Sequence, residues 1–367
     1  MRALLLTALL ALALVAPAAA AAKDSVFKDI SGTVQVRTEE SGAPSATGSG
    51  LPTWSSSFAY GGTIFPYTMI GSSPFAAPRT TTVPTVIVPL DVTLEAADPG
   101  AATRRGSSIA ALTLASPVFE NARFDGPAYA TQYGNAMQKD MFWTTGGSNA
   151  DYNVLLRNDA VYAPRTLTVP ARRGAGIMGA TTGVPFARVD FKWFSAQLKK
   201  LVDELNLPAG TLPIVLTENV YLYDGDSCCV FGLHAAVGNG GTKTTTYVYA
   251  TWTNPALFSP RPGQKKVFMS DVHVLTHEIE GWLTDPFVNN TVPGWTSAFA
   301  PQYGCSDQLD STDPLINYGF ESRMPNGFTY HPQEPAFFSW FAREAPSRGL
   351  NGRYSYSGTL AAPATGC

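Results

Sequence analysis

Two of the four histidines in this 367-residue chain, His273 and His277, lie four residues apart, and Glu278 follows the second one directly. Residues four apart share one face of a helix, so both imidazoles would point the same way. Glu278 would lie about 100° around the helix from His277. An imidazole can bind a metal ion while an adjacent carboxylate accepts the proton of a water molecule. The segment therefore predicts a hydrolytic metal site, with zinc as the expected metal.

The remaining ligands would have to come from distant parts of the chain. His273 is one candidate, and Asp310, about thirty residues after the motif, is another. Asp310 also fits an Asx-type turn before Pro314, and the sequence leaves both alternatives open. His331 lies among aromatic residues and is either a ligand or a histidine at the edge of the core. For His234, the last histidine, a structural role is the simpler interpretation.

The motif resembles the active-site helix of zincin metallopeptidases, whose pattern is His-Glu-x-x-His. His277 and Glu278 match that pattern, but Gly281 stands where the second histidine would be. The resemblance implies that His277 is a metal ligand and that Glu278 is the general base.

The chain is also similar to a group of uncharacterised exported bacterial proteins that share a His-Glu-x-x-x-Trp-x-x-Asp-Pro segment. The shared positions here are His277, Glu278, Trp282, Asp285 and Pro286, then Cys305, Asp310, Asp313, Pro314, Tyr330, His331 and Gln333. That group often has a glutamate at the position of Gly281, whereas this chain has Glu280 one residue earlier. The likeness spans most of residues 58–345 and implies a zincin-like fold.

Three functions are compatible with these residues. The first is an exported zinc-dependent hydrolase, most simply a metallopeptidase acting on a polypeptide or another extracellular polymer. The second is a non-catalytic binding or structural protein on the same fold, whose metal site has been lost at Gly281. The third is a glycoside hydrolase that uses a carboxylate pair drawn from Glu278, Glu280, Asp310 and Asp313.

The elements that would position these residues are strands and a few helices. Amphipathic spacing predicts helices at 131–143 and 189–206, and the motif itself predicts a helix within 271–286 that ends near Pro286. β-branched runs between Gly and Pro predict strands at 63–70, 82–94, 152–156, 165–169, 213–216, 219–223 and 244–251. This order favours an α+β fold, with a β-rich N-terminal region at 23–108 and a zincin-like α+β domain at 109–367.

The first 22 residues have a charged start, an apolar stretch and small residues at the end, which is typical of a secretory signal peptide. We therefore expect a secreted or periplasmic protein with no membrane segment after its removal. The formal net charge of −3 and the absence of a basic cluster argue against nucleic acid as a binding partner.

Four cysteines in an exported chain favour disulfides. We expect the adjacent Cys228 and Cys229 each to reach a distant partner, because pairing with each other needs a strained ring.

Overall fold

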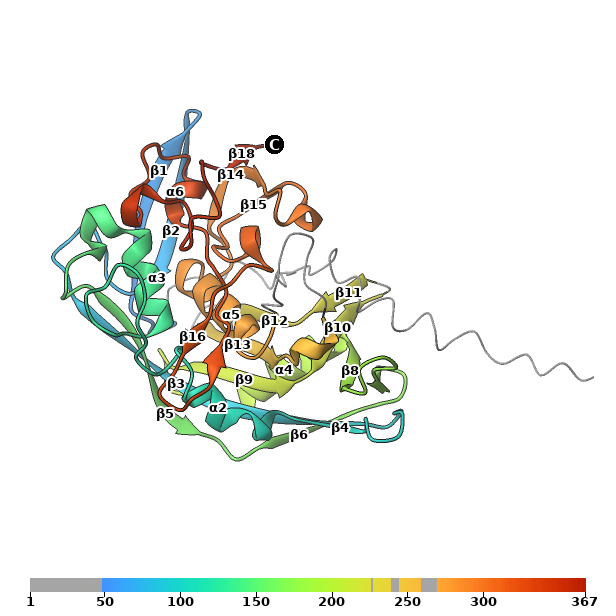
Figure 1. Cartoon of the computed structure of the whole chain (residues 1–367). Coiled ribbons are helices and arrows are strands. Elements are labelled where there is room, and N and C mark those ends of the chain that lie inside the picture. Colours follow the sequence, from blue (N-terminus) through green and yellow to red (C-terminus); the bar gives the residue numbers. More distant parts are fainter. Residues whose placement is uncertain (1–47, 226, 239–243, 259–268) are drawn as a thin grey trace, which may run out of the picture.

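The computed structural model describes residues 48–225, 227–238, 244–258 and 269–367 (Figure 1). The predicted signal peptide lies outside the described residues. The fold is α+β and rich in strands, with 38% strand and 21% helix, which confirms the predicted fold class at this level. Among the described residues, no helix is both long enough and apolar enough to cross a membrane.

A seven-stranded mixed sheet forms the centre of the molecule, with the order β12-β13-β9-β3-β4 and with β5 and β6 beside β3. Its strands are β3 (Thr80–Leu94), β4 (Thr103–Arg105), β5 (Asn153–Val161), β6 (Arg165–Val169), β9 (Leu212–Glu218), β12 (Gly232–Gly238) and β13 (Thr244–Trp252). β3 lies parallel to β9, and β9 lies parallel to β13. β12 pairs antiparallel with β13 and forms the end of the strand order. The sheet thus joins strands of the predicted N-terminal region to strands of the predicted larger domain.

A second, four-stranded sheet has the order β11-β10-β8-β7. It consists of β7 (Gly174–Met178), β8 (Pro185–Asp190), β10 (Val220–Asp224) and β11 (Ser227–Val230). The predicted amphipathic helix follows β8 directly as α4 (Phe191–Leu205). The Asp190 side chain caps it by accepting a hydrogen bond from the Trp193 N–H at 2.7 Å. Its apolar stripe, which includes Phe194, Leu198 and Val202, is buried, as the sequence predicts.

The motif segment forms the helix α5 (His273–Thr284), and every one of its twelve residues is buried. A helix that is buried on all sides must meet partners on all sides. α5 lies against β12 and β13 on one side and against α3 (Tyr133–Met141) and β2 (Thr63–Ile70) on others. Figure 1 shows α5 enclosed between the central sheet and the C-terminal segments. Its histidines and acids are therefore held inside the protein.

Small elements complete the fold around α5. β1 (Thr53–Tyr60) and β2 form a hairpin whose two-residue turn is Gly61-Gly62, both with positive φ as such a turn requires. The short helices are α2 (Ala110–Leu114) and α6 (Phe338–Phe341). The short C-terminal strands are β14 (Thr291–Thr296), β15 (Ser306–Gln308), β16 (Ser322–Arg323), β17 (Thr329–Tyr330) and β18 (Thr365–Gly366). The loops between them carry the polar groups that face α5.

The cysteine pairing differs from the sequence prediction. Cys305 pairs with Cys367, because both β15 and the C-terminal strand β18 pair with β14 and bring the two residues together. Cys228 and Cys229 pair with each other at the start of β11. The expectation that each of these two residues reaches a distant partner is therefore wrong. Because Cys305 and Cys367 pair with each other, neither is available as a distant partner for Cys228 or Cys229.

Candidate functional site

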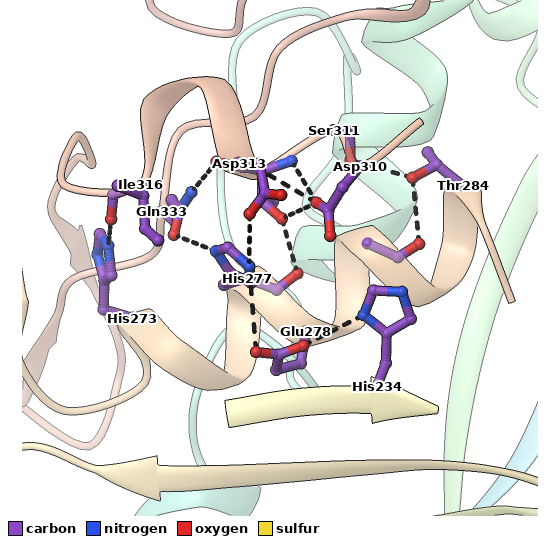
Figure 2. A network of polar contacts seen from close by, with 12 residues as sticks. His234, His273, His277, Glu278, Thr284, Asp310, Ser311, Asp313, Ile316 and Gln333 are labelled. Atoms are coloured by element: carbon purple, nitrogen blue, oxygen red, sulfur yellow. Dashed lines mark hydrogen bonds and ion pairs between the residues drawn. The ribbon is translucent and has the colours of Figure 1, made fainter. Parts of the chain in front are cut away.

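The site is built on the middle of α5, where His277 and Glu278 meet residues from three other segments (Figure 2). His234 comes from the edge strand β12, and Asp310 and Asp313 come from the loop after β15. Gln333 comes from the loop after β17. All of these side chains are buried.

The hydrogen bonds around His277 fix which ring nitrogen is free. The Gln333 amide nitrogen donates to the Thr312 carbonyl oxygen at 2.6 Å, so its amide oxygen is left to accept. That oxygen lies 3.0 Å from Nδ1 of His277, which must then be the protonated nitrogen. Nε2 of His277 therefore carries a lone pair, and it has no hydrogen-bond partner among the described residues.

The free lone pair of His277 faces two carboxylates. Its Nε2 lies 3.6 Å from Oδ1 of Asp313 and 4.0 Å from Oε1 of Glu278. Oδ1 of Asp313 is also buried and has no hydrogen-bond partner in the part of the chain that the structure describes. Burying polar atoms without partners is costly, so two such atoms facing each other indicate that something else belongs between them.

Asp310 completes a group that could hold a metal ion. One ligand atom each from His277, Asp310 and Asp313 lies within 4.8 Å of the other two. Oδ1 of Asp310 is fixed by the backbone N–H of Thr312 at 2.9 Å and by the hydroxyl of the same residue at 2.6 Å. Ligand bonds of about 2.0–2.1 Å in a tetrahedral zinc site put neighbouring ligand atoms roughly 3.3 Å apart. The separation of 3.6 Å between Nε2 of His277 and Oδ1 of Asp313 is slightly longer, and one imidazole with two carboxylates is a donor set that suits a divalent ion.

The charges at the site also favour a cation. Burial and the neighbouring Asp310 raise the pKa of Asp313 well above its usual value. Burial opposes ionisation of Asp310 as well, but His277, His234 and Thr312 together lower the pKa of Asp310 below its usual value. No lysine or arginine of the described ranges forms a salt bridge with Asp310, Asp313 or Glu278. A bound cation would supply the missing positive charge.

Glu278 lies between His277 and His234. Its Oε2 is 3.2 Å from Nδ1 of His234, and its Oε1 faces Nε2 of His277. Two glycines make room for this arrangement. A Cβ on Gly281 would lie 2.8 Å from Cε1 of His234, and a Cβ on Gly232 would lie 2.6 Å from Oε1 of Glu278. Both positions permit close approach between β12 and α5 that any side chain would prevent.

A small pocket adjoins His277 and Glu278. Its volume is about 10 Å³, which is room for about one water molecule. It is lined by Phe231, Gly232, Met269, His273, Val274, His277, Glu278, Ile316 and Gln333. Its walls are mostly apolar, and His277 and Glu278 are among the polar residues that line it.

The structure separates the other predicted ligands from this group. Nε2 of His273 donates a hydrogen bond to the Ile316 carbonyl oxygen at 2.9 Å, because a carbonyl oxygen can only accept. Burial lowers the pKa of His273 to about 4, so its ring is neutral. His331 lies 2.6 Å from Asp271 through Nδ1, ahead of α5. Of the four predicted metal ligands, only His277 and Asp310 belong to the group, and the third member is Asp313.

The other acids of the motif are engaged elsewhere. Glu280 accepts a hydrogen bond from Gln138 of α3 at 3.0 Å. Asp285 accepts from the backbone N–H groups of Asn289 and Asn290, so it closes the turn after the helix. The sequence did not predict Asp313 or His234 as part of a metal site. Asp313 was considered there as a carboxylate of the glycoside-hydrolase alternative, and a structural role was preferred for His234.

Comparison with known protein families, with curated proteins and with solved structures finds no significant match for this chain.

Proposed function

We propose that this protein is an exported metal-dependent hydrolase that binds zinc through His277, Asp310 and Asp313 and cleaves polypeptides. One observation carries the proposal. Two buried atoms without hydrogen-bond partners, Nε2 of His277 and Oδ1 of Asp313, face each other beside Asp310 and Glu278. The local match of His277 and Glu278 to the zincin helix supports the same chemistry, as does the packing of that helix along a mixed sheet.

The roles of the chain's own residues follow from their positions. A divalent ion at this site would acidify a water molecule and polarise the bond to be cleaved. Gln333 holds His277 in the tautomer whose lone pair faces the ion. Thr312 holds Asp310 in place through two hydrogen bonds. Glu278 accepts the proton from the attacking water and returns it to the leaving amine, because its Oε1 faces the same space as His277.

The substrate class is suggested by the pocket beside Glu278. Phe231, Met269, Val274 and Ile316 give it an apolar wall next to the proposed base. The cavity has room for about one water molecule, which suits an attacking water beside Glu278, and a polypeptide would then lie against the apolar wall with a peptide carbonyl near His277 and Glu278. The predicted signal peptide places such a substrate outside the cytoplasm.

The direct test uses protein purified with added zinc and an unfolded polypeptide such as reduced casein. We expect cleavage that a zinc chelator stops and that added zinc restores. Manganese and iron should be offered in parallel, because a set rich in carboxylates also accepts these ions. Protein that binds zinc stoichiometrically and cleaves no polypeptide would contradict the peptidase assignment and favour a metal-binding protein. Protein that takes up none of these metals would contradict the site itself.

A further inference from the structure

The edge strand β12 and the helix α5 pack closely because each contributes one glycine that contacts a side chain of the other. Gly232 and His234 are two residues apart on β12 and therefore point to the same side of the strand. The side chain of Glu278 packs on Gly232, and the ring of His234 packs on Gly281. Each glycine accepts the side chain that the opposite element contributes. This fit fixes both side chains beside the candidate metal group.

Gly281 occupies the helix position one turn after His277, where a side chain would point toward the same group. That space holds the His234 ring instead, since Cε1 and Nδ1 of His234 lie 2.8 and 3.1 Å from the place of a Cβ on Gly281. Oδ2 of Asp310 lies 3.1 Å from the same place. An imidazole from a strand therefore fills a position that the helix leaves empty.

We propose that His234 is a positioning residue for Glu278, an inference that rests on the proposed function. Nδ1 of His234 lies 3.2 Å from Oε2 of Glu278, and both side chains are only 2% exposed. An ionised carboxylate can only accept, so Nδ1–H of His234 donates. This bond occupies one carboxylate oxygen and leaves Oε1 directed toward Nε2 of His277, 4.0 Å away. His234 thus decides which oxygen of Glu278 meets the water.

Two substitutions separate the hydrogen bond from the bulk of the ring. His234→Asn places an amide where Nδ1 stands and keeps a donor for Glu278, whereas His234→Leu keeps a similar volume without a donor. His331→Asn is the matched control, because His331 pairs with Asp271 and does not touch Glu278. Glu278→Gln gives the reference for a lost base.

The probe is cobalt(II), whose visible spectrum reports the ligands and, as pH is varied, the ionisation of the bound water. We expect His234→Leu to bind one equivalent of cobalt but to show its spectral transition about one pH unit higher, a tenfold change in that proton equilibrium. Glu278→Gln removes a negative charge beside that water and should shift the transition in the opposite direction. His234→Asn and His331→Asn should resemble the wild type. Polypeptide cleavage should fall about 10- to 100-fold in His234→Leu and recover in His234→Asn.

A metal-free measurement tests the contact itself. In metal-free protein, the Nδ1 nitrogen resonance of His234 should move in Glu278→Gln and stay in place in His331→Asn. If the cobalt spectrum of His234→Leu changes at the same pH as that of the wild type, the positioning role is overturned. If His234→Leu fails to bind cobalt, as expected for His277→Ala, His234 is a metal ligand instead. Wild-type protein that takes up no cobalt would overturn the proposed function and this role with it, a result distinct from a failure at His234 alone.

Discussion

Gly281 and His234 are in such close contact that a single methyl group on Gly281 would lie 2.8 Å from Cε1 of the histidine ring. The glycine lies in a helix that is otherwise made of larger residues, where glycine costs about 1 kcal/mol relative to alanine. The glycine leaves the space in which the imidazole of His234, on β12, lies next to Glu278.

Replacement of Gly281 by alanine should therefore destabilise the protein, although the same change in an ordinary helix interior is stabilising. The new methyl group must displace His234 or Asp310, and such overpacking costs about 1–3 kcal/mol. Urea unfolding of the metal-free protein measures the change. Gly238→Ala is the control, because a Cβ at Gly238 meets no atom within 4 Å. A Gly281→Ala variant more stable than the wild type would show that the ring does not lie over the glycine.

Replacement of Glu278 by glutamine should remove catalysis and leave the metal in place. The amide cannot accept a proton from water, so the rate of polypeptide cleavage should fall by about 10²–10⁴-fold. Zinc content, measured by atomic emission on the same samples, should equal that of the wild type, because Glu278 lies outside the group formed by His277, Asp310 and Asp313. A Glu278→Gln variant with full activity would remove the general base from this account.

The buried Glu280 should make stability depend on pH. Burial, together with the charge of Asp310, raises the pKa of Glu280 to about 8 against the pull of its hydrogen bond to Gln138. A raised pKa means that the folded state holds the proton more tightly, so its contribution is fully present below the unfolded value of about 4.3. This contribution to stability is lost as the pH rises above that value and through about 8.

Glu280→Gln carries no such proton and should abolish this loss. The free energy of unfolding of the wild type should fall relative to that of the variant by on the order of a few kcal/mol between pH 5 and pH 9. Urea unfolding in the presence of a chelator measures this difference without a contribution from metal. Glu204→Gln, at an exposed position of α4, should follow the wild type. If the free energies of unfolding of the wild type and of Glu280→Gln depend on pH in the same way, Glu280 is ionised in the folded protein.

The bond between Cys305 and Cys367 should be a major source of stability. It closes a loop with a sequence separation of 62, and chain entropy then gives about 4 kcal/mol. Thermal unfolding of Cys305→Ser should show a loss of that order, whereas the double change of Cys228 and Cys229 to serine opens no long loop and should cost less. Peptide mapping without reductant should link the two distant cysteines, and a link from either to Cys228 or Cys229 would contradict the structure.

Local patterns in the sequence were sufficient for the elements that have strong periodicity. The stripe of α4 and the β-branched runs of β3 and β13 appear where they are predicted, because side-chain spacing decides which face is buried. β7 and β12 were not predicted. Both contain glycines and short apolar stretches, and they become strands through their neighbours in the sheet.

Local sequence patterns were likewise insufficient to predict the whole candidate site. The adjacent pair His277 and Glu278 can be read from one helix, but His234 precedes Glu278 by 44 residues and reaches it only because β12 pairs with β13 beside α5. The joint use of Asp310 and Asp313 was equally hidden, since both follow β15 closely and the direction of the Asp310 side chain depends on hydrogen bonds that it accepts from the backbone N–H groups of Thr312 and Asp313. His331, for which the sequence left a ligand role and a place at the edge of the core open, lies against Asp271.

The central claim is that a metal ion lies between His277, Asp310 and Asp313. Its most direct test is anomalous X-ray diffraction at the zinc edge from crystals of protein purified with zinc. The account predicts one strong peak about 2.0–2.2 Å from Nε2 of His277 and from one carboxylate oxygen each of Asp310 and Asp313, and no peak in His277→Ala. A fully buried His277 with no anomalous peak beside it, or a peak at the His331–Asp271 pair instead, would contradict it.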